Sequence, residues 1–241
     1  MTEGFMFGGR STREFDMHVE SYPTQKTAAR KLETIQVPGR SGALHLLQEA
    51  FANYTQEYSC YFHGTQDMPK QAHDVKGWLM GAGANARLED EYDPEHFRLA
   101  TFIGPMDIEN TLNRYGRCVV AFDCAPQAYL KSGEIPIDFE NPGQLYNPTQ
   151  FSALPMIYVR GSGAGTVTVG GTEVTVNEID GQLILDCELL NAYIDGGEGL
   201  PQNKNNCIFA PEFPRLRPGA NAVGWTGDIT GVTIIPRWWE L

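Results

Sequence analysis

Apolar residues alternate with polar ones in most segments of this chain that carry a regular pattern. In the clearest case, Cys118, Val120, Phe122 and Cys124 are separated by single residues. A spacing of two places such side chains on one face of a strand. The longest unbroken apolar run, Cys118 to Phe122, is far shorter than the roughly 20 residues of a membrane-spanning helix. The sequence therefore predicts a mainly β protein that does not cross a membrane.

The distribution of charge and glycine changes near residue 128. Residues 1–128 hold 12 of the 18 basic residues and all five histidines, whereas residues 129–241 hold 15 of the 26 glycines. A length of 241 residues allows one large domain or two small ones, at about 150 residues per domain. We therefore predict two domains, residues 1–128 and residues 129–241.

The first domain combines strands with one helix. Alternation predicts strands around Phe5–Phe7, Tyr58–Phe62 and Cys118–Cys124, and Gly8-Gly9 favours a hairpin into a second strand that contains Phe15, Met17 and Val19. Asp67 is typical of a helix N-cap. The predicted helix carries Ala72, Val75, Trp78 and Leu79 on one face and ends at Gly81 and Gly83. Asp93-Pro94-Glu95 is a second capping signal, for a short helical turn.

The second domain is predicted to be a β-sandwich, because short apolar stretches are separated by turn residues. Strands are predicted at 155–159, 166–169, 173–176, 183–185, 191–195, 222–225 and 232–235. Gly170-Gly171 and Asp180-Gly181 are predicted hairpin turns. Gly161-Ser162-Gly163-Ala164-Gly165 resembles a phosphate-binding loop. A strand pattern follows it instead of a helix, so we predict a third hairpin turn there.

The candidate catalytic and metal-binding residues lack the spacing that such sites require. We therefore predict no catalytic residue, no metal site and no cofactor. The five cysteines include no Cys-x-x-Cys pair, which favours reduced, buried thiols of an intracellular product. Cys60, His63, Cys118 and Cys124 lack the spacing of a zinc site. The acidic run from Glu89 to Glu95 is explained by a solvated loop. A net charge of −12 argues against specific nucleic-acid binding.

Two further features suggest contacts with other molecules. Pro38, Gly39 and Arg40 form a tight turn with Arg40 at its tip. Two interpretations are open: a hairpin turn within one subunit, or a ring contact in which Arg40 pairs with a carboxylate of a neighbour. If Val232 to Leu241 is one strand, Trp238 and Trp239 point to opposite faces. One tryptophan is then buried, and the other packs on the linker or first domain or contacts a partner.

Several short motifs, in their order along the chain, resemble the distal tail protein of long-tailed, non-contractile bacteriophages. The N-terminal Met1-Thr2-Glu3-Gly4-Phe5 carries no signal-peptide pattern. The motifs are Phe5-Met6-Phe7-Gly8-Gly9 followed by Glu14-Phe15-Asp16, then Ile35-Gln36-Val37-Pro38-Gly39-Arg40-Ser41-Gly42, Arg114-Tyr115-Gly116-Arg117, Asn147-Pro148-Thr149 and the C-terminal Pro236-Arg237-Trp238-Trp239-Glu240-Leu241.

This resemblance implies that residues 1–128 form a belt domain, a β-sandwich plus helix that assembles into a homo-oligomeric ring, a hexamer. It implies that residues 129–241 form a β-sandwich similar to galectins and carbohydrate-binding modules. The implied partners are the tail tube protein, the tail-associated lysin or hub protein, and receptor-binding proteins. The implied location is the distal end of the virion tail, with assembly in the cytoplasm of the host bacterium.

Two alternative functions remain open from the sequence. The first is a carbohydrate-binding module that holds a sugar against Tyr193 or Trp225. The second is a cell-wall glycoside hydrolase that uses Glu89, Asp90, Glu91 or Glu95, because glycosidases need two carboxylates at a defined separation.

Overall fold

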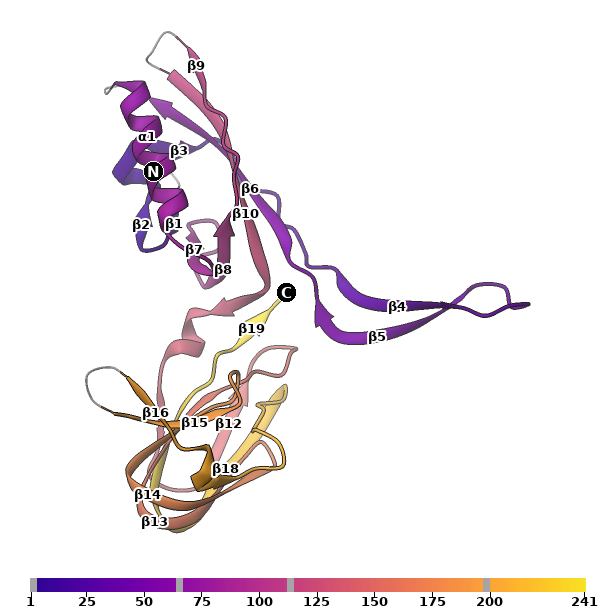
Figure 1. The fold of residues 1–241 in the computed structure, drawn as a ribbon, viewed down its shortest axis with the longest axis vertical. Helices are drawn as coiled ribbons and strands as arrows, with labels where there is room; N and C mark the ends of the chain where they lie inside the picture. The colour runs from indigo at the N-terminus through magenta and orange to yellow at the C-terminus, as the bar shows by residue number, and fades with distance from the viewer. Residues whose placement is uncertain (1–3, 64–66, 112–114, 197–199) are drawn as a thin grey trace. The chain divides into compact units, whose positions relative to one another are not determined.

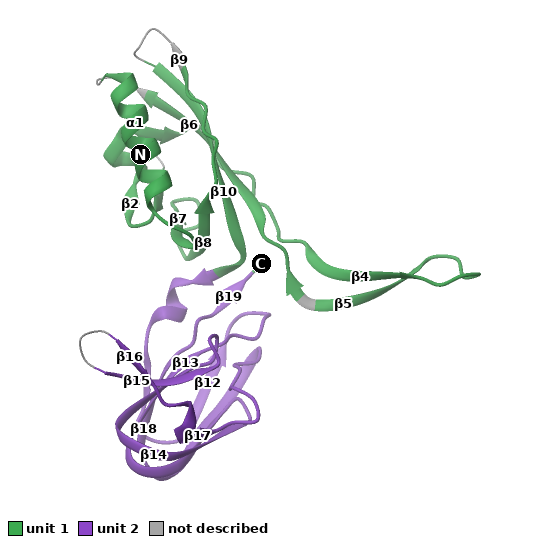
Figure 2. Ribbon diagram, in the orientation of Figure 1, with its two compact units in different colours: residues 1–128, 241 green, residues 129–240 purple. Residues whose placement is uncertain are grey.

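The computed structural model describes residues 4–63, 67–111, 115–196 and 200–241. The fold is mainly β, as predicted, and the described residues contain one α-helix. The chain divides into two compact units, residues 1–128 with residue 241, and residues 129–240 (Figure 2). We call them unit 1 and unit 2.

Unit 1 is built around one large antiparallel sheet. Its strand order is β2-β1-β7-β8-β10-β6-β3, and β9 also pairs with β10. The elements are β1 Phe5–Phe7, β2 Arg10–Ser11, the 3₁₀ turn η1 Thr12–Phe15, β3 Met17–Val19, β4 Arg30–Gln36, β5 Ala43–Phe51, β6 Tyr54–His63, α1 Met68–Gly81, β7 Ala86–Asp90, β8 His96–Phe102, β9 Glu109–Thr111 and β10 Tyr115–Leu130.

One face of this sheet carries the core of unit 1. The alternating residues of β6 and β10 that predicted strands are buried, among them Tyr58, Phe62 and Phe122. Helix α1 lies against this face (Figure 1) and contributes Val75 and Trp78 to the core. The indole nitrogen of Trp78 donates to the carbonyl oxygen of Phe7, 2.9 Å away, so a large apolar side chain is buried with its polar atom satisfied.

The helix begins and ends where the sequence predicts, but its N-terminus is stabilised differently. Asp67 is the N-cap residue, yet its carboxylate makes no capping hydrogen bond. Pro69 lies in the first turn, where its missing N–H costs nothing because that group has no partner within the helix. The second capping signal is wrong as a helix start, because Asp93-Pro94-Glu95 lies in the turn between β7 and β8.

The predicted opening hairpin is also different in the structure. After Gly8-Gly9 the chain pairs back with β1 for only two residues, and Phe15 lies in η1 rather than in a strand. Met17 and Val19 do form a strand, but β3 pairs with β6. The reason is the capping box of η1, in which Ser11 and Glu14 satisfy each other's backbone N–H groups and turn the chain.

Unit 2 is one curled antiparallel sheet with strand order β11-β18-β13-β14-β15-β16; β12 pairs with β18 and β17 with β14. Its core holds Ile157, Val169, Val174 and Ile234. The elements are the 3₁₀ turn η2 Lys131–Glu134, β11 Ile137–Phe139, β12 Gly143–Asn147, β13 Met156–Val169, β14 Thr172–Asp186, β15 Asn191–Asp195, β16 Pro201–Asn203, the 3₁₀ turn η3 Asn205–Cys207, β17 Ile208–Phe209, β18 Gly219–Ile235 and β19 Trp239–Glu240.

Two of the three predicted hairpin turns of unit 2 are wrong. Gly170-Gly171 is a turn, but residues 161–165 lie inside the 14-residue strand β13, and Asp180-Gly181 lies inside β14. Gly161 pairs with Gly181, and the register shifts between Gly163 and Gly165. The glycines therefore mark a bulge at which the long strands bend, so that both ends of β13 contribute to the same core.

Candidate interaction surfaces

Strands β4 and β5, with the loop 37–42 between them, form a hairpin that we call the arm. The two strands pair with each other as a sheet of their own, and the arm extends away from the rest of unit 1 (Figure 1). Every residue of β4 is exposed. Six large apolar side chains of the arm are exposed by 37–66%: Leu32, Ile35, Val37, Leu44, Leu46 and Leu47. Such a concentration of exposed apolar side chains typically marks a surface that another molecule covers.

The loop of the arm contains the predicted contact residues Pro38, Gly39 and Arg40, all exposed. The backbone N–H of Arg40 donates to the carbonyl oxygen of Val37, 3.1 Å away, and Gly39 has a positive φ of 78°, which favours glycine. The loop is thus a hairpin turn within the chain. A pairing of Arg40 with a carboxylate of a neighbouring subunit stays a prediction.

The C-terminal tryptophans both pack within unit 2. The predicted strand from Val232 to Leu241 is wrong, because β18 ends at Ile235 and Arg237 adopts a left-handed φ of 57°. Trp238 is 4% exposed and belongs to the core of unit 2. Trp239 stacks on Phe151 with ring centroids 4.4 Å apart, and its indole nitrogen donates to the carbonyl oxygen of Ser152 at 3.0 Å. Phe151 and Ser152 both belong to unit 2, and packing of Trp239 on the linker or first domain, or on a partner, stays a prediction.

Arg237 is held in place by the carboxylate of Asp186, which lies 51 residues earlier in the sequence. Its guanidinium binds both oxygens of the buried Asp186, at 2.9 and 3.1 Å, and reaches Glu188 at 3.3 Å. Burial alone would raise the pKa of Asp186, but hydrogen bonds from Arg237 and from the backbone N–H groups of Leu189 and Glu188 hold that pKa below its ordinary value. The pair fixes the C-terminal segment to the turn after β14.

Acid should therefore weaken unit 2. A carboxyl group whose pKa is lower in the folded state stabilises the fold above its unfolded pKa of about 3.9, and this stabilisation is lost as the pH falls through the folded pKa. Replacing Asp186 with Asn should lower the free energy of unfolding by about 1.5–3 kcal/mol at neutral pH. Between pH 6 and pH 2, the free energy of unfolding should then fall less steeply than in the unchanged protein. Urea unfolding across this range tests the prediction. The exposed Glu173→Gln is the control, and an unchanged pH slope in Asp186→Asn would contradict it.

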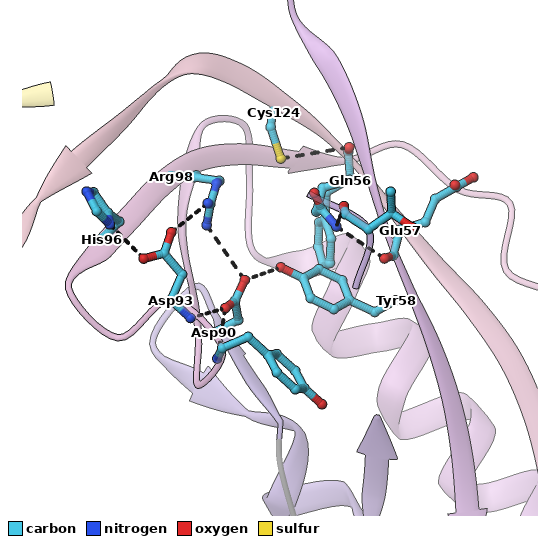
Figure 3. Close-up of polar contacts among 11 residues, drawn as sticks. Gln56, Glu57, Tyr58, Asp90, Asp93, His96, Arg98 and Cys124 are labelled. Atoms are coloured by element: carbon cyan, nitrogen blue, oxygen red, sulfur yellow. Dashed lines mark hydrogen bonds and ion pairs between the residues drawn. The ribbon is translucent and has the colours of Figure 1, made fainter. Parts of the chain in front are cut away.

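The acidic run from Glu89 to Glu95 is a solvated loop only in part: Glu91 and Glu95 are exposed in the turn after β7, whereas Asp90 is buried. Asp90 is 8% exposed, and it accepts a hydrogen bond from the hydroxyl of Tyr58 at 2.8 Å (Figure 3). Arg98 lies 3.6 Å from Asp90 and 2.8 Å from Asp93. Asp93 also contacts the Nδ1 atom of His96 at 2.6 Å. The network holds the β7–β8 turn in place.

This network argues against the hydrolase alternative. A general acid must hold a proton near the working pH. Burial alone would raise the pKa of Asp93, but His96 and Arg98 lower it below the ordinary value. Glu91 forms an ion pair with Arg13, and Glu89 with Arg87. Glu89, Asp90 and Glu91 are thus engaged in ion pairs, whereas Glu95 is exposed.

The cysteines, which were the candidates for a metal site, lie in the interior of the fold. Cys60 lies directly opposite Cys118 across β6 and β10, all five cysteines are free and buried, and burial raises the pKa of Cys124 and of Cys187 to about 12. Among the described residues no group of three His, Cys, Asp or Glu side chains could hold a metal ion; the side chain of His63 lies outside the described part.

Of the sugar-binding candidates, Trp225 packs against the core of unit 2 and Tyr193 is half-buried. Arg114, part of one motif of the family resemblance, falls outside the described residues. Within the part of the chain that the structure covers, no helix is long and apolar enough to cross a membrane.

Comparison with known proteins gives a fold but no sequence family. No family model matches the chain, and no curated protein sequence matches it. Among solved structures, the chain is similar to Dit (gp 19.1) of phage SPP1, described as a paradigm of the hub adsorption apparatus in phages that infect Gram-positive bacteria. The similarity covers 100% of both chains with a TM-score of 0.76 and 11% sequence identity. At this identity the likeness establishes the fold.

Proposed function

We propose that this chain is a structural hub protein at the distal end of a phage or prophage tail. The observation that carries the proposal is the match of the complete fold, over 100% of both chains, to a hub adsorption protein. The sequence motifs support the same family independently, because they depend on residue order and not on the fold. In this role the protein acts by assembly and not by catalysis.

The proposed assembly is a closed ring, a hexamer, formed by residues 1–128 as a belt domain. The arm supports this assembly, since it presents exposed apolar side chains outside the core of its own unit. Contacts between two different surfaces of identical subunits either close into a ring or continue as a filament. Residues 129–241, the second domain, take no part in closing the proposed ring.

The proposed ring joins the tail tube protein to the tail-associated lysin or hub protein, and provides attachment for receptor-binding proteins. It is located at the distal end of the virion tail, after assembly in the host cytoplasm. The ion pairs of Glu89, Asp90 and Glu91 favour this structural role over the hydrolase.

Ring formation is directly testable. Purified protein, alone and mixed with the tail tube protein of the same phage, should give particles with a central hole in negative-stain images. Multi-angle light scattering should give a mass of about six times the 26.7 kDa chain. Monomer alone at high concentration, with no rings in the presence of the tube protein, would refute the proposed assembly.

A further inference from the structure

Two of the five cysteines lie directly opposite each other in the sheet of unit 1. Cys60 of β6 and Cys118 of β10 are register partners, and directly opposite residues of two antiparallel strands have their side chains on the same face. That face is the core face, because Cys60 is 1% exposed and Cys118 is 6% exposed. The two thiols therefore meet inside the fold of unit 1.

The backbone already places the two residues at the separation of a disulfide. Directly opposite residues of antiparallel strands have Cα atoms about 4.5 or 5.5 Å apart, according to their hydrogen-bonding position. The Cα atoms that a disulfide joins usually lie about 4.4–6.8 Å apart. The side chains interact as well: a hydrogen bond with the thiol of Cys118, together with burial, raises the pKa of the Cys60 thiol.

A disulfide at this position would be under mild strain. The Cβ atoms of directly opposite residues are about 4.5–5.5 Å apart, whereas a disulfide holds its Cβ atoms about 3.5–4.5 Å apart. The two strands must therefore approach each other by up to about 1 Å at this point. Strained disulfides are reduced more readily than relaxed ones, so such a bond is open in a reducing environment and closed in an oxidising one.

The other three cysteines are placed differently. Cys124 lies six residues beyond Cys118 in β10, about 20 Å along the strand, and its register partner is Tyr54. Cys187 and Cys207 belong to unit 2, and neither lies in a strand. In the described strands, Cys60 and Cys118 are thus the only two cysteines that are paired in register.

We propose that Cys60 and Cys118 form a reversible disulfide that joins β6 to β10 when the protein leaves a reducing compartment. The inference goes beyond the proposed hub role, because the bond lies within one unit and forms whether or not the protein assembles into a ring. The bond closes the loop of residues 61–117, which contains α1, β7, β8 and β9. Closing a long loop restricts the unfolded chain and stabilises the fold.

The bond also has a consequence for a hub that is made in the host cytoplasm, as proposed above. Thiols stay reduced in the cytoplasm, whereas disulfides persist outside the cell. The fold of unit 1 is therefore more easily opened during assembly, and it becomes more stable after release into an oxidising medium.

The oxidant that the proposal requires is a small-molecule disulfide, such as oxidised glutathione. The thiolate of Cys118, the more exposed of the two residues, attacks one sulfur atom of this disulfide and displaces one small thiolate, which leaves a mixed disulfide. The thiolate of Cys60 then attacks the Sγ atom of Cys118 and displaces the second small thiolate. The two protons of the protein thiols pass to the two small thiols, and two electrons reduce the small disulfide. Because both cysteines are buried, the exchange requires local opening of the sheet and takes minutes to hours.

Thiol counting and peptide mapping test the inference. The full chain is purified in reductant, transferred to oxidised glutathione under native conditions, and then unfolded, alkylated and digested. The free thiols per chain should fall from five to three, and a linked pair of peptides should contain Cys60 and Cys118 and separate in dithiothreitol. The melting temperature of unit 1 should rise by about 5–15 °C on oxidation and return on reduction.

Cys118→Ala and Cys124→Ala are the matched variants, because both replace a buried thiol of β10. Cys124→Ala should still lose two thiols and gain thermal stability on oxidation, whereas Cys118→Ala should do neither. Melting curves of the reduced variants verify folding. If Cys118→Ala does not fold, the linked peptides of the unchanged protein decide the question.

Three results would overturn the inference. The first is five free thiols after oxidation, both in buffer and in urea just below the unfolding transition, where access to the thiols is no longer limiting. The second is glutathione adducts without a link between cysteines, and the third is a link between other cysteines. Rings that form without the bond leave the proposed function standing while the inference fails. A link between Cys60 and Cys118 in a protein that forms no rings supports the inference alone.

Discussion

Replacing Trp238 with alanine is expected to lower the free energy of unfolding of unit 2 by about 3–5 kcal/mol, the range for removing a buried tryptophan. The side chain is 4% exposed and lies in the unit 2 core among strands that are otherwise filled by aliphatic residues. The residue is therefore an anchor for the whole C-terminal segment.

The backbone around Trp238 increases the effect. Its carbonyl oxygen accepts from the N–H of Leu130 at 2.9 Å, and the N–H of Arg237 donates to the carbonyl oxygen of Gly133 at 2.8 Å. A Cβ on Gly133 would lie 3.2 Å from the Cβ of Trp238 and closer still to its backbone nitrogen. Loss of the indole thus loosens the segment that packs on η2, and the melting temperature of unit 2 should fall clearly.

Trp239→Ala is the matched control, because it removes the same side chain one residue away. Trp239 is partly exposed, and its stacking on Phe151 and hydrogen bond to Ser152 together account for about 1–2 kcal/mol. Calorimetry of both variants should therefore show a clearly larger shift for Trp238→Ala. Small and equal shifts would contradict the anchoring role.

Sequence patterns predicted the elements whose signals are local. The alternation in Tyr58–Phe62 and Cys118–Cys124 identifies β6 and β10. Of the predicted helix face, Val75, Trp78 and Leu79 are buried in α1, whereas Ala72 is only half-buried. Each of these elements buries one face, so its apolar residues recur at the spacing of a strand (2 residues) or of a helix (3.6 residues). Strand β15 lies at Asn191–Asp195 as predicted.

Contacts between distant residues could not be predicted in the same way. Arg237 and Asp186 are 51 residues apart, and Tyr58 and Asp90 are 32 apart. No local pattern marks either pair, because the partner is selected by the strand order. An acidic run is usually solvated, and the burial of Asp90 depends on Tyr58 and on Arg98 of the adjacent strand β8.

The arm could be recognised only in part. Pro38, Gly39 and Arg40 predicted its turn, since glycine and proline signals are local. Its exposure could not be predicted, because Leu32, Leu44 and Leu46 have the composition of a core strand. A strand that is covered only by another molecule has the same sequence signal as a strand covered by its own fold. An exposed apolar strand of this kind is therefore recognised only when the rest of the core is accounted for.

The glycine segment of β13 lies at a close approach of two strands and not at a hairpin turn. Glycine marks turns, but it also marks points where two backbones approach closely. A Cβ built on Gly161 would overlap the carbonyl oxygen of Asp228 and lie 3.1 Å from the Cα atom of Ile229, both in β18. The neighbouring atoms are backbone, so they cannot rotate away.

Gly161→Ala should therefore destabilise unit 2 by about 1–3 kcal/mol, as overpacking typically does, by forcing β13 and β18 apart at the bend. Gly224→Ala is the matched control in β18, because the nearest atom to its Cβ would be 3.9 Å away; it should be neutral or slightly stabilising, since alanine restricts the unfolded chain more than glycine does. Urea unfolding of the two variants measures the difference. If Gly161→Ala proved as stable as Gly224→Ala, the strands would have room at this point, and the close backbone approach would not be what requires glycine at the bend.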